Sequence, residues 1–362
     1  MKTSYGYDTY RGRTKLQTAL TVLIWILVAV LLLSVAAFFF LQKYMVYTDD
    51  GQARLELPFL QQVSPPPSAP IQSEPLVIVT AEPTPSSTPE PTPMPIQVPE
   101  IVPVSLFRAA VTEGNGLQLV AAGGGNAALL NLKANDGSLG YVSALPQAIS
   151  LRSSESDPKL NDQLKLLTGS GLYTVARISC FKDNLAPKAD PSLAIKTNSN
   201  YNWRDGEDTR WMNPSVEAVR EYVVQICGEL AAMGFDELLL DNACWPTTGR
   251  LEYIKEGSDY DPSNLTGSLE AFYEEVRKGL EGQDILLSIA VNAGALTGEE
   301  PRSGLTAALL GEYADRVYVL GAESRGACDD VLAAAGLSGN AVLYVDPALT
   351  DLSTTGKGIC MP

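Results

Sequence analysis

The sequence contains no histidine. Without imidazole the chain cannot form a Ser-His-Asp triad, a Cys-His dyad or a His-ligated zinc site, and it has no His general base. Basic residues are also few, because 26 Lys and Arg stand against 42 Asp and Glu and leave a formal net charge of −16. A field of this sign repels a polyanion, so we expect no nucleic-acid partner. Chemistry must come from carboxylates, Lys, Tyr or Cys, or from a bound cofactor.

Cysteine is scarce, and no two cysteines have the CxxC spacing of redox or metal motifs. We therefore predict no metal site and no cofactor, and the default role of these side chains is that of small buried apolar groups. A redox or nucleophilic role for Cys180 and Cys244, beside the ends of neighbouring predicted strands, is the alternative. The odd total leaves at least one thiol unpaired. The five residues are Cys180, Cys227, Cys244, Cys328 and Cys360.

A long uncharged run lies between Lys15 and Lys43. It exceeds the roughly 20 apolar residues that span a bilayer, so we predict a cytoplasmic tail over residues 1–15 and a single transmembrane helix over 16–42. Four basic residues precede the run, which places the N-terminus in the cytoplasm and the rest of the chain outside the cell membrane. A cleaved signal peptide is the alternative, but its apolar region is typically about 7–15 residues long.

Proline dominates the segment that follows. Residues 58–103 contain 14 prolines among 46 residues, interleaved with Ser, Thr and Glu. This composition is typical of extended polyproline segments and not of a packed domain. We therefore predict that residues 43–103 form a juxtamembrane segment and a Pro-rich disordered stalk.

The remaining residues, 104–362, have the typical size of a (β/α)₈ barrel. Apolar, β-branched runs alternate with amphipathic runs, which predicts an α/β fold with a parallel sheet buried on both faces. The expected helices are Lys159–Leu167, Ser215–Met233, Ser268–Glu281, Gly304–Tyr313 and Ala327–Ala335. The seven expected strands are Val104–Val111, Ala127–Leu132, Leu172–Ser179, Glu237–Asp241, Ile285–Val291, Arg316–Leu320 and Ala341–Val345. An eighth could only be Gly358–Met361, so the barrel closes with a short strand or stays open.

One helix has clear end signals. Asn213 is a good N-cap, Pro214 suits the first helical position, and Gly234 is a typical stop signal. The expected strand Glu237–Asp241 follows at once, so Asp241 falls at the carboxyl end of a strand. In a (β/α)₈ barrel this end carries the active site.

Four segments in order, LYTVARISCFKD, LAPKADPSLAIKT, NWRDGEDTRWMNP and GFDELLLDNACWP, resemble the putative glycosyl hydrolase barrels of membrane-anchored, extracytoplasmic bacterial proteins. The resemblance is dense over Leu172–Pro246. It implies a (β/α)₈ fold, an envelope location and action on a polysaccharide or cell-wall glycan, with Asp241 as the strand-four carboxylate. Other family positions in the third strand and the loop after it are matched by Arg177, Lys182, Asp183, Trp203 and Arg204.

The residues around Asp241 also suit a sugar site. Rings such as Trp203, Trp211 and Trp245 offer faces to pyranose C–H groups, although core packing is an equal alternative for each. We include Asn242 and Trp245 among the candidate substrate-binding residues because they follow Asp241 directly.

The sequence departs from the family pattern where chemistry is expected. After Asp241 the family continues with Tyr and, two residues later, Arg, whereas Asn242 and Cys244 stand here. Asn131 replaces an acidic residue at the end of strand two, and Ser288–Gly294 has no charge where the family has Asp in strand five. A glycosidase needs two carboxyl groups, so Asp241 requires a partner.

Glu323, after the sixth strand, is the first choice for that partner because a strand-end position is held firmly. Separations of about 5–5.5 Å between the carboxyls suit retention and about 6.5–9.5 Å inversion. The other candidates are Asp183, Asp346, Glu299 and Glu300. Two functions stay open: an anchored glycoside hydrolase that uses Asp241 with a partner, and a non-catalytic barrel that binds glycan or acts as a scaffold.

Overall fold

The computed structural model describes residues 45–47, 53–55, 97–349, 352 and 359–360. The chain divides into two compact units, residues 1–88 and 89–362. In the first unit, strand β1 (Met45–Tyr47) pairs with β2 (Ala53–Leu55) in an antiparallel ladder. None of the helices in the described ranges has the length and apolar character needed to cross a membrane. The predicted tail 1–15, the predicted transmembrane helix 16–42 and most of the predicted stalk lie outside the described residues.

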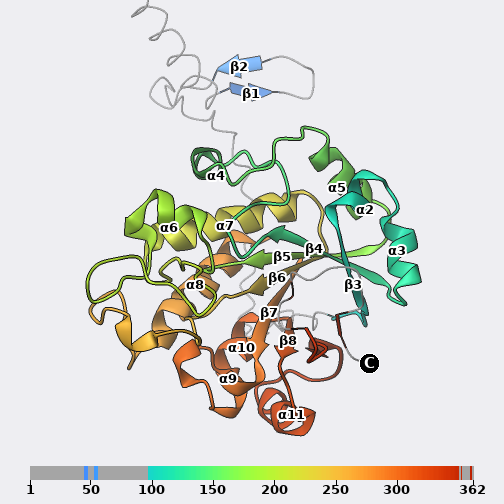
Figure 1. The fold of residues 1–362 in the computed structure, drawn as a ribbon. Coiled ribbons are helices and arrows are strands. Elements are labelled where there is room, and N and C mark those ends of the chain that lie inside the picture. Colours follow the sequence, from blue (N-terminus) through green and yellow to red (C-terminus); the bar gives the residue numbers. More distant parts are fainter. Residues whose placement is uncertain (1–44, 48–52, 56–96, 350–351, 353–358, 361–362) are drawn as a thin grey trace, which may run out of the picture. The chain divides into compact units, whose positions relative to one another are not determined.

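The second unit is an α/β domain built on a curled, seven-stranded parallel sheet that resembles a (β/α)₈ barrel (Figure 1). Each strand pairs with the next one along the chain, from β3 to β9. The strands are β3 (Pro103–Leu106), β4 (Ala127–Lys133), β5 (Tyr173–Ser179), β6 (Glu237–Asp241), β7 (Leu286–Asn292), β8 (Arg316–Leu320) and β9 (Val342–Tyr344).

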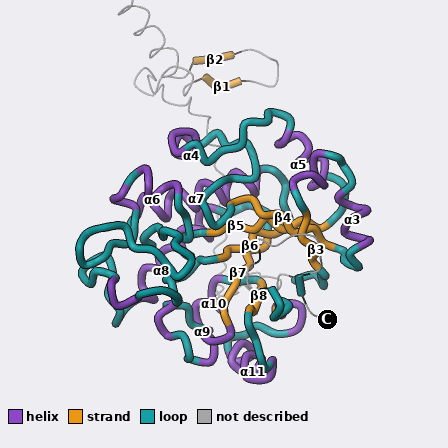
Figure 2. The backbone as a smooth tube through the Cα atoms, viewed as in Figure 1, coloured by secondary structure: helices purple, strands orange, loops and turns teal. Residues whose placement is uncertain are grey.

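Helices lie around the outside of this sheet, as the tube drawing in Figure 2 shows. The α-helices are α2 (Arg108–Thr112), α3 (Gly116–Ala122), α4 (Pro146–Leu151), α5 (Leu160–Thr168), α6 (Leu185–Ala189), α7 (Glu217–Ala232), α8 (Leu265–Gly279), α9 (Ala293–Thr297), α10 (Ala307–Tyr313) and α11 (Arg325–Ala334). Four short 3₁₀ turns are η1 (Pro191–Leu193), η2 (Leu251–Tyr253), η3 (Pro301–Ser303) and η4 (Gly339–Ala341).

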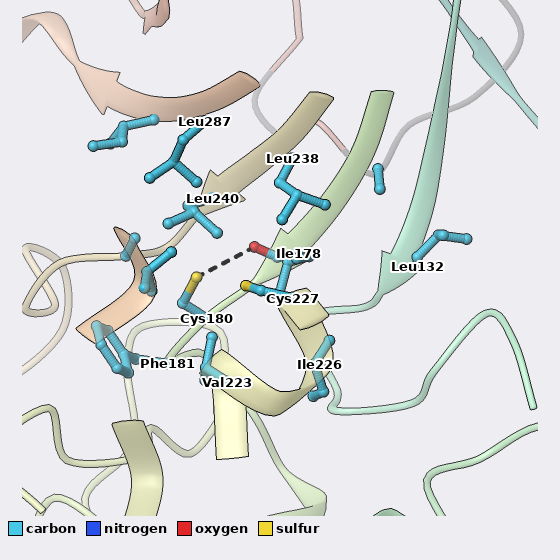
Figure 3. Close-up of a cluster of buried hydrophobic side chains, with 14 of the residues drawn as sticks. Leu132, Ile178, Cys180, Phe181, Val223, Ile226, Cys227, Leu238, Leu240 and Leu287 are labelled. Atoms are coloured by element: carbon cyan, nitrogen blue, oxygen red, sulfur yellow. Dashed lines mark hydrogen bonds between the residues drawn. The ribbon is translucent and has the colours of Figure 1, made fainter. Parts of the chain in front are cut away.

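Side chains alternate between two apolar clusters along each strand, as the two-residue period of a strand requires. In β6, Leu238 and Leu240 belong to the larger cluster, which packs the sheet against its helices, while Leu239 belongs to the smaller cluster inside the curl. Figure 3 shows the larger cluster, in which Cys180 and Cys227 lie among leucines and isoleucines. Because alternate residues of β6 share one face, Glu237, Leu239 and Asp241 all face the interior of the curl.

An ion pair fills the amino-terminal end of the interior. Arg316 Nη1 lies 2.7 Å from Glu237 Oε2, and both side chains are fully buried. Glu237 also accepts hydrogen bonds from Ser288, Tyr173 and Tyr318. A buried pair needs such additional bonds to offset the loss of hydration. This end of the barrel is therefore packed, and the opposite end carries the cavity.

The two edges of the sheet are joined by a short antiparallel segment and not by a regular eighth strand. Asp346 N donates to Ile359 O at 2.8 Å, and Ile359 N donates to Pro103 O at 3.1 Å. Cys360 forms an isolated antiparallel bridge with Val345. Of the segment 358–361, in which an eighth strand was expected, only residues 359 and 360 are described, and they link β9 to β3.

Several element boundaries differ from the sequence-based expectation, including those of the first strand and of helix α7. The first strand ends at Leu106 and not at Val111, because helix α2 starts at Arg108. Helix α7 starts at Glu217, so Asn213 is not its N-cap: the Asn213 side chain accepts from Ser215 N in a separate turn. The expected stop is confirmed, because α7 ends at Ala232 and Gly234 has a φ of 85°.

Candidate functional site

A half-enclosed cavity of about 190 Å³ opens at the carboxyl ends of the strands, above Asp241. Asp241 is the last residue of β6, and Asn292, the last residue of β7, lines the same cavity. The other polar lining residues are Asn135, Lys182, Asp205, Glu207, Asn242, Thr247, Thr248, Glu300 and Ser303. Two tryptophans, Trp211 and Trp245, contribute to the walls together with Cys244, Leu305, Leu320 and Leu352.

The Asp241 carboxylate is held from below by Arg177. Arg177 Nε donates to Asp241 Oδ2 at 2.9 Å, and Nη2 donates to the same oxygen. The other oxygen, Oδ1, accepts from Asn242 N at 2.8 Å. The Arg177 side chain is fully buried, whereas 12% of the Asp241 side chain is exposed. Arg177 therefore orients the carboxylate and does not reach the cavity, although the sequence suggested that it binds substrate.

Arg177 is fixed by residues of β4 and the loop that follows. Its Nη1 donates to Asn131 Oδ1 at 2.7 Å, and its Nη2 donates to Asn135 Oδ1 at 2.6 Å. Asn131 stands where the family has an acidic residue, so a neutral amide accepts from the guanidinium here.

Asn242 has a left-handed backbone, with φ at 48°. This conformation is uncommon for residues other than glycine, and Asn tolerates it better than most. The side chain offsets part of the strain, because Nδ2 donates to Asn135 Oδ1 at 3.2 Å and to Ser179 Oγ at 3.1 Å. Strained residues of this kind cluster at functional sites. Here the turn directs the chain away from β6 and leaves the Asp241 carboxylate at the cavity floor.

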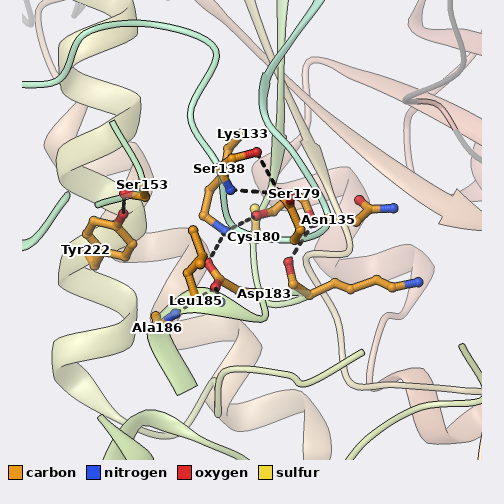
Figure 4. Close-up of polar contacts among 12 residues, drawn as sticks. Lys133, Asn135, Ser138, Ser153, Ser179, Cys180, Asp183, Leu185, Ala186 and Tyr222 are labelled. Carbon is orange, nitrogen blue, oxygen red and sulfur yellow. Dashed lines mark hydrogen bonds and ion pairs between the residues drawn. The ribbon is translucent and has the colours of Figure 1, made fainter. Parts of the chain in front are cut away.

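A second buried ion pair supports the loop after β5 (Figure 4). Lys133 Nζ lies 2.8 Å from Asp183 Oδ2 and donates to Ser179 O. Asp183 Oδ1 accepts from Leu185 N and Ala186 N at the start of α6. Asp183 is 1% exposed and lies outside the cavity lining, so its contacts position this loop.

Lys182 is the one cation among the residues that line the cavity. Its Nζ lies 2.7 Å from Glu207 Oε2 and 3.3 Å from Asp205 Oδ2. Burial would lower the pKa of Lys182, but the bonds and charges of Glu207 and Asp205 outweigh burial and raise the pKa. Asp205 Oδ2 also accepts from Trp211 Nε1 at 2.9 Å, so this aspartate fixes both the lysine and the indole.

The tryptophans differ in position. Trp245 lines the cavity, is 1% exposed and donates from Nε1 to Leu265 O and Ser268 Oγ. Trp203 is 2% exposed and donates to Arg250 O, and it borders a separate shallow depression together with Arg204. The structure thus brings Asp241, Lys182, Asn242 and Trp245 to one cavity, and it places Trp203 and Arg204 in the neighbouring depression.

Three other carboxylates line the cavity with Asp241: Asp205 and Glu207 are paired with Lys182, and Glu300 lies in the loop before η3. Its Oε2 accepts from Asn292 Nδ2 at 3.4 Å, and it has no ion pair within the described part of the chain. Glu323, the partner expected from the sequence, is exposed and does not line this cavity. The sequence alone did not identify Asn292, Asp205 or Asn135 as residues of the cavity. The strand-end position of Asn292 is a signal that could have identified this residue, whereas nothing in the sequence marks Asp205 or Asn135.

Cys244 is the thiol at the cavity. Burial, with smaller contributions from the charges of Asp241 and Glu300, raises its pKa to about 12. Burial also raises the pKa of Cys180, which is fully enclosed and contacts Ile178 O. A thiol with a raised pKa is a poor nucleophile at neutral pH. These environments favour a packing role for both cysteines.

Several known proteins are similar to this chain. A hypothetical protein from Ruminiclostridium thermocellum is 24% identical over 51% of this chain and 96% of its own, with a TM-score of 0.45. The glycoside hydrolase domain of PgaB (BpsB) from Bordetella bronchiseptica is 17% identical over 66% and 80%, with a TM-score of 0.45. Ega3 from Aspergillus fumigatus, in complex with galactosamine, is 12% identical over 69% and 79%, with a TM-score of 0.39.

No curated protein sequence matches the chain. A family model described as a putative glycosyl hydrolase domain matches residues 105–320, which is more than half of the chain and includes every strand from β4 to β8. The matched range contains Asp241 and the other polar residues of the cavity. The chain therefore belongs to this putative glycosyl hydrolase domain family.

Proposed function

We propose that the domain cleaves a glycosidic bond of a glycan that enters the Asp241 cavity. The observation that carries this proposal is that Asp241 shares one cavity, walled by Trp211 and Trp245, with Glu300, a carboxylate that has no ion pair within the described residues. Glycoside hydrolysis needs one carboxylic acid that protonates the leaving oxygen and one carboxylate that acts as nucleophile or base. Indole rings supply the apolar surface that pyranose C–H groups contact.

The two carboxylates have different surroundings, which supports different roles for them in the proposed reaction. Asp241 accepts two hydrogen bonds from a guanidinium, so it suits the ionised partner that attacks the anomeric carbon or activates water. Glu300 accepts from an amide and has no cation beside it in the described ranges, so it suits the acid that donates a proton. Glu323 remains the partner that the sequence alone suggests, and its absence from the cavity lining argues for Glu300 instead.

The experiment is a screen of the full-length chain against soluble neutral polysaccharides and aryl glycosides, with release of reducing ends or of the aryl group as the readout. We expect turnover on at least one substrate and its loss in Asp241→Asn, because the amide keeps the shape but removes the charge. General acid–base and nucleophilic groups typically contribute about 10²–10⁴-fold. Equal turnover in wild type and Asp241→Asn would remove this residue from the reaction.

A second function, glycan binding without cleavage, is favoured by a specific observation. Amides stand near the carboxyl ends of three strands around Asp241, namely Asn131 within β4, Asn242 directly after β6 and Asn292 at the end of β7. Two of them, Asn242 and Asn292, line the cavity and can bond sugar hydroxyls without taking part in proton transfer. Retention of a polysaccharide without any release of reducing ends would support this function over hydrolysis.

The location of the glycan is a further part of the proposal. The predicted transmembrane helix 16–42 and the Pro-rich stalk place the domain outside the cell membrane, where its partners would be a polysaccharide or cell-wall glycan and, through the helix, the membrane itself. The support is the uncharged run between Lys15 and Lys43 and the basic residues before it. Proteolysis of intact cells tests this location, because an external domain is accessible to added protease.

A further inference from the structure

Two shallow depressions continue from the Asp241 cavity across the loops after β5 and β6. Asp205 borders both the cavity and the first depression, which has a volume of about 440 Å³. Asn202 and Arg204 border both the first and the second depression, whose volume is about 430 Å³. Each hollow therefore shares wall residues with the next, and we refer to this series of three hollows, from the Asp241 cavity to the second depression, as the track.

The track has a rigid floor because the two loops are bonded to each other. Asn198 N donates to Tyr253 O at 3.0 Å, and Lys255 N donates to Lys196 O at 2.8 Å. The Trp203 indole lies buried beneath and donates to Arg250 O at 2.9 Å.

A glycine at the junction brings the loops into direct contact. Gly249 has a φ of 99°, and a Cβ there would lie 3.0 Å from Asp205 Cα. Asp205 in turn accepts from the backbone N–H groups of Glu207 and Thr209 and from the Trp211 indole. Asp205, which borders both the cavity and the first depression, is therefore held by several bonds within the chain.

Two tyrosine rings are presented on this floor. Tyr253 borders the first depression and is 48% exposed, and Tyr201 borders the second and is 74% exposed. The Arg250 guanidinium lies 5.6 Å from the centroid of the Tyr253 ring. The faces of such exposed rings are free to contact the C–H groups of sugars.

The charges along the first depression balance. Its lining contains two arginines, Arg204 and Arg250, and two aspartates, Asp205 and Asp208. Arg204 is already paired with Asp208 at 2.6 Å, and Asp205 is paired with Lys182. A lining without net charge favours an uncharged ligand over an anionic one.

We propose that the two depressions are outer subsites for sugar units of the same glycan chain that enters the Asp241 cavity, with Tyr253 and Tyr201 as their stacking surfaces. This inference rests on the proposed function for the identity of the ligand. The wall residues shared between neighbouring hollows give the glycan chain a path from one hollow to the next. The hydrogen bonds between the two loops form the surface beneath it, and the exposed tyrosine rings contact its sugar units. The chain therefore binds a polymer better than a single sugar.

The test is affinity electrophoresis of the full-length chain through gels that contain hydroxyethyl cellulose, arabinoxylan or glycol chitin. All variants carry Asp241→Asn, so that the polymer is not cut during the run. We compare Tyr253→Ala, Tyr201→Ala and the ring-preserving Tyr253→Phe. Phe107→Ala is the matched control, because Phe107 is also an exposed aromatic residue but borders none of the three hollows.

We expect at least one polymer to retard the Asp241→Asn chain. Each Tyr→Ala change should raise the dissociation constant by about 2- to 10-fold, as expected for the loss of one aromatic contact. Tyr253→Phe and Phe107→Ala should migrate like the parent. Unchanged retardation in both Tyr→Ala variants, or no retardation by any of the three polymers, would overturn the inference. Failure of the proposed hydrolysis gives a different result, namely retardation that depends on the tyrosines in a wild-type chain that releases no reducing ends.

Discussion

Arg177 Nε lies 2.9 Å from Asp241 Oδ2, and this bond joins a fully buried guanidinium to the carboxylate at the floor of the cavity. The two residues stand on neighbouring strands, β5 and β6, whose pairing places Ser179 opposite Asp241 and Arg177 opposite Leu239. The parallel register thus aligns an arginine with an aspartate two residues further along. The orientation of the candidate catalytic group is therefore set by the sheet itself.

We predict that Arg177→Ala lowers the free energy of unfolding by about 3 kcal/mol, because removal of one partner leaves the other charge unpaired in a buried site. The matched control is Arg204→Ala, which breaks an exposed pair with Asp208 and should cost less than about 1 kcal/mol. Denaturant titration of both variants measures the difference. Equal losses of unfolding free energy in the two variants would show that the buried pair contributes no more to stability than the exposed pair.

Gly137→Ala tests the position of the Lys133–Asp183 pair. A Cβ at residue 137 would lie 2.2 Å from Asp183 Oδ1, and the φ of 96° is unfavourable for any other residue. We expect a loss of more than about 2 kcal/mol, from strain together with displacement of the carboxylate. Gly171→Ala is the control, because its φ of 81° is similar but nothing lies within 4 Å of its Cβ. A loss no larger than that of Gly171→Ala would contradict the close approach of Asp183.

The cysteines should be unreactive in the folded chain. Burial raises the pKa of Cys227, Cys244 and Cys360 to about 12. At neutral to mildly alkaline pH we expect slow reaction with a disulfide reagent in buffer and reaction of all five thiols in concentrated guanidinium chloride. Rapid labelling of a thiol without denaturant would show that its side chain is accessible as a thiolate.

The raised pKa values of the buried cysteines also predict a loss of stability in alkali. A thiol ionises near its ordinary pKa of about 8.5 when unfolded but near 12 when folded. The folded state therefore binds more protons over this range, so the stabilisation is complete below about 8.5 and disappears as the pH rises towards 12. Replacing Cys227 with Ala should flatten this part of the pH–stability curve. An unchanged slope would show that other groups cause the loss of stability in alkali.

Much of the architecture follows from the sequence pattern, and the exceptions have physical reasons. Buried parallel strands are short apolar runs, so β4 to β9 were found within one or two residues. The first strand was drawn too long because Arg108–Thr112 has no signal that separates a short helix from a strand. Helix α7 was started too early because an Asn-Pro pair forms a turn as readily as a helix start.

The candidate site was less predictable, because the burial of a side chain and the direction in which it points depend on the tertiary structure. A sequence shows that Arg177 lies on a strand near Asp241, but only the register shows that its guanidinium lies beneath the carboxylate. Glu300 and Glu323 are both acidic residues in loops after strands, and the arrangement of loops decides which one borders the cavity. Asp241 is the last residue of a strand, which is why a strand-end argument identified it, whereas Lys182 was expected only from the family resemblance.

The central claim is that Asp241 and Glu300 act together at one cavity. Its most direct test is the initial rate of Asp241→Asn, Glu300→Gln and Glu323→Gln on whichever glycan the wild type cleaves. We predict that the first two variants fall by about 10²-fold or more, and that Glu323→Gln keeps a rate close to that of wild type. A large loss in Glu323→Gln together with an unchanged Glu300→Gln would contradict the account.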